Sequence, residues 1–412
     1  MAKTLAPGAL QRRAFLKQAG TLGAASALGA TPLAALAADA SRLILPFDNG
    51  ERELVAYPQK RPLILLTARP PQLETPFGVF NEGEITPNDA FFVRYHWAGI
   101  PTSIDPQSYR LKVAGNVATP LELTLDEIRQ LGAVDLVAVN QCSGNSRGFF
   151  TPRANGGQLG NGAMGNARWT GVPLKKLLEK AGVKAGSVQV TFNGLDTPPL
   201  GDGPDFVKAL NLDHAMDGEV MLAWQMNGAD LPMLNGYPLR LVVPGHYGTY
   251  WVKHLSEITV TDKVFDGFWM AAAYRIPDNG CACVEPGSAP TKTVPIGRFT
   301  VRSFITSVRD GAQLHAGKPV EVRGIAFDGG YGIGEVAFST DGGKNWQSAQ
   351  LGKDLGRYSF RGWSAAFTPH KGAHELRVRA VNRAGQSQPT TALWNPAGYL
   401  RNGVEAVRVT AI

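Results

Sequence analysis

A lone cysteine begins a loop whose residues could bind both a metal and an anion. Cys142 follows the strand-like run Leu136–Asn140, and Ser143, Gly144 and then Arg147 come after it. A thiolate is a soft ligand for a transition metal, and a nearby guanidinium lowers the pKa of a thiol and can hold an anion. The same pattern also fits an inert buried cysteine, or a cysteine nucleophile whose histidine base the sequence does not place.

Two further segments carry residue types that bind anions. In Phe91–Trp97 an apolar run ends in Arg94, Tyr95 and His96, which offer a planar fork of donors and an imidazole. A strand end whose polar side chains face water is the simpler interpretation. The second segment runs from Tyr237 to Lys253 and places a Gly-flanked loop between two cations, a pattern that suits a phosphorylated or heteroaromatic cofactor.

The elements that position these segments form an α+β domain. Strand-like runs alternate with short helices between about residues 86 and 275, and 48 glycines and 28 prolines suit many tight turns. Two segments have helical patterns, Leu125–Leu131 with acidic residues in its first turn and Leu174–Ala181 with Gly182 as its cap. The predicted strands are Tyr109–Val113, Leu136–Asn140, Val188–Phe192, Glu219–Trp224 and Arg240–Val243.

A second domain follows a Pro- and Gly-rich linker at Cys281–Pro295. Alternating runs such as Val320–Gly324 and Glu375–Val381, separated by Asp-Gly turns, predict an immunoglobulin-like β-sandwich of about 115 residues. With a Pro-rich, partly extended entry segment from about residue 39, the expected domains are 1–38, 39–290 and 291–412.

The N-terminus has the pattern of an export signal. Adjacent arginines in Gln11–Lys17 precede the weakly apolar stretch Ala19–Ala30 and an A-x-A-like cleavage site at Ala35 and Ala37. This is the twin-arginine pattern, which exports folded proteins to the periplasm, and no apolar run of about 20 residues follows to span a membrane. Subtracting the four cations near the N-terminus from the net charge of +7 leaves about +3, scattered, so no nucleic-acid partner is expected.

The other two cysteines, Cys281 and Cys283, are expected to pair poorly because the loop between them is tight. No C-x-x-C-H occurs, so no haem is expected in this chain. A zinc or copper site built from these cysteines with His246 and His254 is conceivable, but their spacing matches no structural zinc site and loop packing is the plainer interpretation.

Together the segments F-x-V-R-x-H, N-Q-C-x-G-N-x-R and Y-P-x-R-x-V-V-P-G…V-K stand in the order seen in sulfite oxidases. The chain therefore resembles that family over essentially its whole mature length, most closely the molybdenum catalytic subunit of bacterial periplasmic sulfite dehydrogenases. The resemblance implies a mixed α/β molybdopterin domain followed by an immunoglobulin-like dimerisation domain.

The resemblance also implies roles for individual residues. Cys142 would supply the thiolate ligand of molybdenum, whose other ligands include a pterin dithiolene. The cofactor would be held by Arg94, Tyr95, His96, Asp196, Asn235, Arg240, Trp251, Val252 and Lys253. The catalytic residues would be Arg94, His96, Arg147, Tyr274 and Arg401.

This sequence departs from the vertebrate pattern at three positions. Asn235 stands where vertebrate members carry histidine, and Phe206 lies near the place of their active-site tyrosine. Tyr274 resembles the equivalent tyrosine of the bacterial enzymes. Ala397 replaces the arginine of W-N-x-R-G, a charge that Arg401 could supply.

The implied activity is the two-electron oxidation of sulfite to sulfate, with electrons passed singly to a c-type cytochrome on a separate chain. A homodimer, or a heterodimer with a cytochrome subunit, is expected by analogy. The alternatives are a sulfane dehydrogenase subunit acting on protein-bound sulfur, a reductase of sulfoxides, and a non-enzymatic secreted binding protein.

Overall fold

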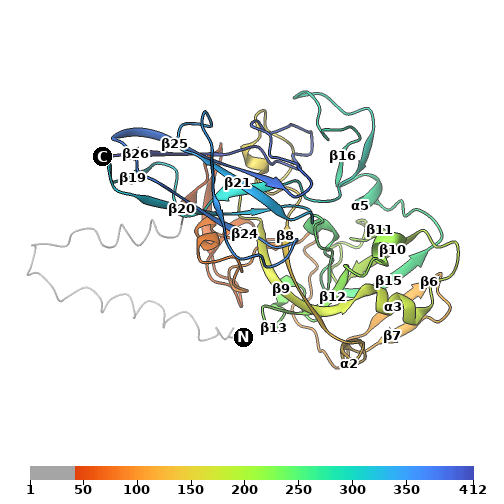
Figure 1. The fold of residues 1–412 in the computed structure, drawn as a ribbon. Helices are drawn as coiled ribbons and strands as arrows, with labels where there is room; N and C mark the ends of the chain where they lie inside the picture. The colour runs from red at the N-terminus through yellow and green to blue at the C-terminus, as the bar shows by residue number, and fades with distance from the viewer. Residues whose placement is uncertain (1–41) are drawn as a thin grey trace, which may run out of the picture. The chain divides into compact units, whose positions relative to one another are not determined.

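The structure is a computed structural model that describes residues 42–412. The twin-arginine signal and the expected boundary at residue 38 lie outside the described residues. Within them, strands dominate and the longest helix has eight residues (Figure 1). None of the described helices has the length and apolar character needed to cross a membrane.

The entry segment is more regular than expected, because it forms an antiparallel five-stranded sheet in the order β1-β2-β3-β4-β5. Its strands are β1 (Arg42–Ile44), β2 (Glu51–Val55), β3 (Leu63–Thr67), β4 (Gln72–Glu74) and β5 (Val93–Arg94), with a 3₁₀ helix η1 (Phe77–Asn81) before β5. Arg94 pairs with Gln72 at the edge of this sheet, so the chain leaves the sheet where its polar run begins.

A second sheet delivers Cys142. It has the order β13-β12-β9-β8, with β14 paired to β12, and its strands are β8 (Val134–Gln141), β9 (Met164–Pro173), β12 (Met221–Met226), β13 (Ala229–Asp230) and β14 (Arg240–Val242). Strands β8 and β9 pair over eight residues, from Val134 to Gln141. The Cys142 amide then donates to Ala163 O at 2.9 Å, so the cysteine is held by the same ladder that ends at Gln141.

The third sheet has the order β11-β10-β15-β6-β7, in which only β15 and β6 are parallel. Its strands are β6 (Leu111–Gly115), β7 (Leu121–Leu123), β10 (Gln189–Gly194), β11 (Lys208–Asn211) and β15 (Leu255–Thr261). The two predicted helices are confirmed as α2 (Leu125–Arg129) and α3 (Leu174–Ala181). Thr124 and Glu127 cap α2 reciprocally, and Gly182 ends α3 at a φ of 70°.

The remaining helices are single turns, α4 (Leu212–Ala215), α5 (Phe268–Ala271), η2 (Arg147–Phe149), η3 (Met233–Asn235) and η4 (Gly248–Tyr250). Each predicted strand of this region is present, within a few residues of its expected bounds. The region is therefore mostly β with few helices, and its helical share is smaller than the expected α+β class implied.

The C-terminal region is built of two sheets around a separate apolar core, to the left in Figure 1. One sheet has the order β18-β20-β24-β23 and the other β19-β26-β25-β21-β22. Their strands are β18 (Arg302–Ile305), β19 (Ala312–Leu314), β20 (Val320–Phe327), β21 (Ile333–Ser339), β22 (Gln347–Ser348), β23 (Gln350–Leu351), β24 (Arg361–Phe367), β25 (Gly372–Asn382) and β26 (Ala406–Ala411).

Aromatic side chains join this region to the rest of the fold. Phe77 and Phe80 of η1 meet Phe304 and Phe360 edge to face, with ring centroids 5.4 Å and 5.9 Å apart. All but Phe77 are buried in the main apolar core, and Phe77 packs against it. Packing of these four aromatic rings fixes the C-terminal sheets against the entry segment.

The expectation for Cys281 and Cys283 is wrong. The two form a disulfide with Cα atoms 5.1 Å apart, in the connection between β16 (Arg275–Pro277) and β17 (Thr293–Pro295). Ala282 between them has a φ of 49°, a left-handed conformation that shortens the path between the two side chains. Residues 42–412 contain no group of three or more His, Cys, Asp or Glu side chains arranged to hold a metal ion.

Candidate active site

Two cavities meet at Cys142. The first cavity is lined by more residues and has a volume of about 630 Å³. The second has a volume of about 660 Å³, and both volumes include the open mouth of the cavity. Arg94, Cys142 and Tyr274 line both cavities, so the thiol stands where the two meet. A group bound in the first cavity would present a metal held by Cys142 to a ligand in the second.

Every residue predicted to bind the cofactor lines the first cavity. These residues come from three sheets and their loops, and they are Arg94, Tyr95, His96, Cys142, Asp196, Asn235, Arg240, Trp251, Val252 and Lys253. Arg147 lines the second cavity. The tertiary structure thus brings together segments that lie far apart along the chain, while the roles of the individual residues stay predictions.

The loop after Cys142 is held by its own side chains. The Asn145 backbone amide donates to Cys142 O at 3.0 Å, and the Asn145 side-chain oxygen Oδ1 accepts from Ala163 N at 3.0 Å. Ser146 adopts a left-handed φ of 70°, which turns the chain into η2 and aims Arg147 back toward the cysteine. The Cys142 side chain is buried, with 8% of the residue exposed.

Backbone acceptors fix the Arg147 guanidinium. Nε donates to Ala397 O at 2.9 Å and Nη1 to Gly157 O at 3.1 Å, while Nη2 has no protein acceptor within residues 42–412. A side chain on Gly144 would lie 2.5 Å from Nη1, so only glycine leaves room for the guanidinium there. Nη2 is therefore free to bind an anion in the second cavity.

His96 and Tyr274 form a second polar pair at the junction of the cavities. The His96 Nε2 and the Tyr274 hydroxyl are hydrogen bonded, and the imidazole stacks on Phe206 with centroids 3.6 Å apart. Burial, with Arg94, Lys208 and Lys253 nearby, keeps the pKa of His96 well below its usual value. The imidazole is therefore neutral at pH 7 and fixes the direction of the phenol.

The first cavity contains several cationic side chains whose hydrogen bonds go mainly to backbone oxygens. Burial lowers the pKa of Arg240 to about 9, and its guanidinium donates to Asn235 O at 2.8 Å and Trp251 O at 3.2 Å. Lys253 donates to Arg94 O at 2.8 Å and stands 2.9 Å from the Tyr95 ring centroid. The carboxyl of Asp196 is buried too, and burial raises its pKa to about 6.

The residues present fit an anionic pterin cofactor. Four residues that line the first cavity each have a buried polar side-chain atom with no hydrogen-bond partner within residues 42–412, namely Asn140 Oδ1, Ser143 Oγ, Thr249 Oγ1 and Arg240 Nε. Buried polar atoms are rarely left unpaired, so their presence in one cavity indicates a polar ligand. Arg240 and Lys253 suit its phosphate, the Asp196 carboxylate suits pterin N–H groups, and Cys142 suits the metal.

Asn235 lines the first cavity as expected, and its side-chain amide also makes hydrogen bonds within the protein. Its Oδ1 accepts from Lys60 Nζ at 2.5 Å and its Nδ2 donates to Phe92 O at 3.1 Å. Lys60 is itself buried, and burial lowers its pKa to about 7. Asn235 therefore lies between two cations: its side chain accepts from Lys60 and its backbone oxygen accepts from Arg240.

Arg401 does not occupy the place suggested by the sequence, since it lines neither cavity. Its Nη1 donates to Glu405 at 2.5 Å, and its guanidinium carbon stands 5.1 Å from the Phe149 ring centroid. The charge of Arg401 is thus paired with the Glu405 carboxylate. At position 397, the backbone oxygen of Ala397 accepts a hydrogen bond from Arg147.

Sequence reasoning missed several residues of the site. Lys208 is wholly buried, donates to Trp269 O at 2.5 Å and stands 5.1 Å from the Tyr274 ring centroid. Ser143 lines the first cavity next to Cys142, and that neighbour is the one sequence signal for it. Thr249 and Tyr399 carry no local signal, because their importance comes from contacts with distant segments.

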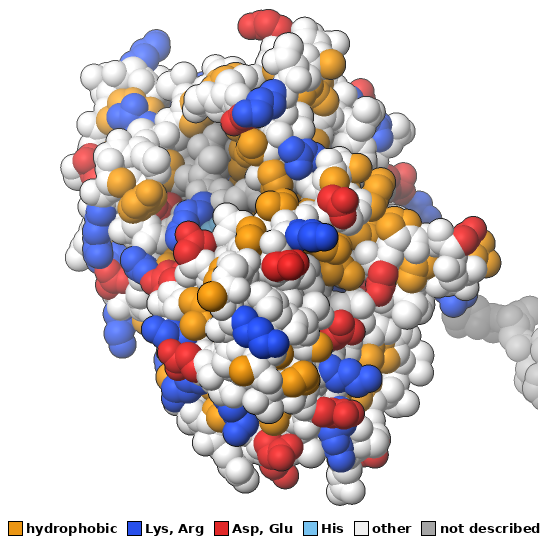
Figure 2. Space-filling model, turned by 90° about the vertical axis from the view of Figure 1, so that its right-hand side faces the viewer, with side chains coloured by type: hydrophobic (Ala, Val, Ile, Leu, Met, Phe, Trp, Pro, Cys, Tyr) orange, Lys and Arg blue, Asp and Glu red, His pale blue; other side chains and the backbone are white. Residues whose placement is uncertain are grey.

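One face of the molecule shows the scattered charge expected from the sequence. Figure 2 shows acidic and basic side chains intermixed over the face drawn, with a hollow in its upper half. No continuous basic stripe, as nucleic-acid binding would need, crosses this face.

Comparisons with known proteins agree with this geometry. Residues 97–269 match the oxidoreductase molybdopterin binding domain, and residues 293–411 match the Mo-co oxidoreductase dimerisation domain. The chain is 33% identical to human mitochondrial sulfite oxidase over 371 residues, which is 85% of this chain and 66% of that protein. It is 31% identical to sulfite oxidase of Arabidopsis thaliana over 383 residues, 86% of this chain and 96% of that protein.

A solved structure is similar over nearly the whole chain. The sulfane dehydrogenase SoxCD from Paracoccus pantotrophus superposes with a TM-score of 0.70 and 26% identity, covering 94% of this chain and 93% of that one. The cofactor of the matched domain is a molybdenum-molybdopterin, which suits the soft thiolate and the cationic cavity described above. From these matches and from the convergence of its motifs on Cys142, the chain belongs to the sulfite oxidase family of molybdopterin oxidoreductases.

Proposed function

We propose that this protein oxidises sulfite to sulfate and passes the electrons one at a time to a separate c-type cytochrome. The observation that carries the proposal is the junction of the two cavities, where Cys142 meets Arg94 and Tyr274 and faces the second cavity that Arg147 lines. The human relative spans a longer chain, of which this one matches about two thirds, so its activity is carried over only as a proposal.

The protein's share of the chemistry is to bind and orient a small dianion. When bound, the molybdenum cofactor takes up the two electrons released as sulfite and water become sulfate and two protons. The free Nη2 of Arg147 donates to the anion, with the cation of Arg94 beside it. In a site shielded from water these charges stabilise an oxyanion far more than they would in solution.

The Tyr274 hydroxyl can donate its hydrogen bond either to the anion or to His96 Nε2. Because the imidazole is neutral, its hydrogen bond with the phenol adds no charge to the site, and the arginines supply the positive charge beside the anion. Asp196, Arg240 and Lys253 line the first cavity and would hold the cofactor there.

A steady-state assay of sulfite-dependent cytochrome c reduction tests the proposal, with molybdenum measured in the same preparation. The metal-loaded protein is expected to reduce cytochrome c only when sulfite is present. The Cys142→Ser variant is expected to lose the turnover and most of its molybdenum. If protein that carries molybdenum shows no turnover, sulfite is not its substrate. If Cys142→Ser shows full turnover, Cys142 is not the molybdenum ligand.

A sulfane dehydrogenase acting on protein-bound sulfur is the second candidate, favoured by the similarity to SoxCD over 94% of the chain. It differs in needing a carrier protein as substrate. Turnover of free sulfite by the isolated protein favours the first candidate. Turnover only after addition of a persulfide-bearing carrier favours the second.

The chain is further proposed to reach the periplasm by twin-arginine export, with domains at 39–290 and 291–412. Arg12→Lys with Arg13→Lys is expected to leave the precursor in the cytoplasm on cell fractionation.

The C-terminal sheets are proposed to be immunoglobulin-like, and the description of their matched model favours dimerisation. Light scattering of the purified protein, with and without a cytochrome subunit, distinguishes a homodimer from a heterodimer.

A further inference from the structure

The segment between β25 and β26 leaves the C-terminal region and lies against the Cys142 loop. Three side chains anchor it: Trp394 Nε1 donates to Pro152 O at 2.8 Å, Asn402 Nδ2 donates to Val301 O at 3.2 Å, and Glu405 pairs with Arg302 at 3.0 Å. Residues 394–405 are therefore anchored near both ends, and the part between the anchors lies beside the active site.

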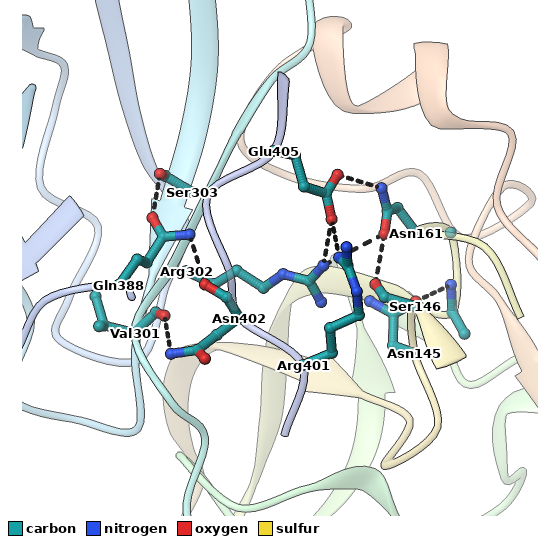
Figure 3. A network of polar contacts seen from close by, with 12 residues as sticks. Asn145, Ser146, Asn161, Val301, Arg302, Ser303, Gln388, Arg401, Asn402 and Glu405 are labelled. Carbon is teal, nitrogen blue, oxygen red and sulfur yellow. Dashed lines mark hydrogen bonds and ion pairs between the residues drawn. The ribbon is translucent and has the colours of Figure 1, made fainter. Parts of the chain in front are cut away.

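Figure 3 shows the anchor at Glu405 in detail. The carboxylate accepts from Arg302, Arg401 and Asn161, the last at 2.8 Å, and the Asn161 carbonyl oxygen is hydrogen bonded to the Ser146 hydroxyl. Ser146 precedes Arg147 directly. The same carboxylate thus ties the C-terminal segment to the turn that aims Arg147.

Tyr399 lies at the centre of this segment, between two groups of the anion site. Its ring stacks on Tyr274 with centroids 5.7 Å apart and planes 6° from parallel. The guanidinium carbon of Arg147 stands 5.1 Å from the same ring centroid. A single side chain therefore supports both the cation and the phenol that are placed to hold the substrate.

Hydrogen bonds and close packing also fix the backbone around Tyr399. Asn395 donates from Nδ2 to Tyr399 O at 2.8 Å and accepts from Tyr399 N at 3.1 Å, which clamps both polar groups of the residue. Gly398 has a φ of 61°, and a side chain there would lie 2.7 Å from Arg147 Cγ. The turn is thus shaped to bring Ala397 O and the Tyr399 ring to one guanidinium.

We propose that Tyr399 is a positioning residue of the substrate site, which holds Arg147 and Tyr274 in the geometry that binds a tetrahedral or pyramidal oxyanion. This inference rests on the proposed function for the class of substrate. Its consequence is that the C-terminal region completes the anion site through its own segment, with a tyrosine and a backbone carbonyl in place of an added cation.

The ring, rather than the hydroxyl, carries the predicted role, because both contacts are made by its faces and no hydrogen bond joins its hydroxyl to another group in residues 42–412. Tyr399→Phe is therefore expected to behave like the unchanged protein. Tyr399→Leu and Tyr399→Met remove the ring, and Met retains most of the apolar volume if the leucine variant folds poorly.

The test measures sulfate binding by calorimetry and sulfite turnover on molybdenum-loaded protein. Loss of one aromatic stack and one cation–π contact in a water-poor site is expected to weaken sulfate binding about tenfold. The KM for sulfite should rise by a similar factor with a smaller change in kcat, because the substrate is held less well. Tyr399→Phe should stay within about twofold in both measurements.

Tyr358→Leu is the matched control. Tyr358 also lies under a guanidinium, that of Arg357 at 4.8 Å, but Arg357 lines neither cavity, whereas Arg147 lines the second. Tyr358→Leu should leave sulfate affinity unchanged. Equal sulfate affinity in the ring-free variants and the unchanged protein, or a tenfold loss in Tyr399→Phe, would overturn the inference.

The two proposals fail differently. A protein that binds sulfate but does not oxidise sulfite defeats the proposed function, and the role of Tyr399 is then judged on sulfate affinity alone. Absence of sulfate binding by the unchanged protein overturns the inference itself, since it denies that these groups form an anion site.

Discussion

Replacing Glu405 with glutamine perturbs the carboxylate that joins the C-terminal segment to the Cys142 loop. The change keeps the shape of the side chain and removes its charge. Its two arginine partners are buried, with side-chain exposures of 1% for Arg302 and 13% for Arg401, while that of Glu405 is 26%. Two guanidinium groups would then share a site without a counter-charge.

The magnitude follows from burial. Removing one partner of a buried ion pair costs about 3–5 kcal/mol, because the other charge is left uncompensated. Since Glu405 is partly exposed, we expect a value near the lower end, about 3 kcal/mol. In a chain of this size each kcal/mol lowers the melting temperature by about 2 °C, so the expected loss is about 6 °C.

Thermal unfolding by circular dichroism measures the shift, and Glu375→Gln provides the control. Glu375 also pairs with two arginines, Arg377 at 2.6 Å and Arg408 at 3.7 Å, but their side chains are 30% and 70% exposed and Glu375 is 30% exposed. Exposed pairs contribute about 0–1 kcal/mol, so this variant should melt within about 2 °C of the unchanged protein. Equal melting temperatures for the two variants would refute the reasoning from burial.

Three further predictions concern the site and its supports. Arg147→Met should lower kcat/KM for sulfite about 10- to 100-fold, mainly through KM, because a charge-assisted hydrogen bond of about 1.5–3 kcal/mol is lost; unchanged kcat/KM with full molybdenum content would contradict its place beside the anion. Tyr274→Phe should lower kcat about 100-fold if its hydroxyl stabilises the reacting anion, and an equal rate in both proteins would remove it from the chemistry. Glu74 is wholly buried, and burial raises its pKa to about 7 from 4.5. At Glu74 the folded protein thus holds more protons than the unfolded chain between these pH values, so this group alone should lower the free energy of unfolding by about 3 kcal/mol as the pH rises through them. Urea denaturation should show the difference: between these pH values the free energy of unfolding of Glu74→Gln should lack that part of the fall.

Part of the fold could be predicted because it depends on local pattern. The helix Leu174–Ala181 was expected with its bounds and its glycine cap, since leucines at helical spacing and a residue free to adopt a left-handed φ are visible in a short window. The strand before Cys142 was expected for the same reason. The disulfide between Cys281 and Cys283 was not, because it depends on the left-handed conformation of Ala282.

The amino-acid sequence alone determined which chemistry the protein carries, since a thiol after a strand, an Arg-Tyr-His run and a glycine loop between cations are properties of side chains and their order. Only the tertiary structure decided which charges reach the anion site. Arg401 turns toward Glu405, and a backbone oxygen at Ala397 holds Arg147 from 250 positions away. Contacts across such separations arise from packing of whole sheets, and no short window of sequence records them.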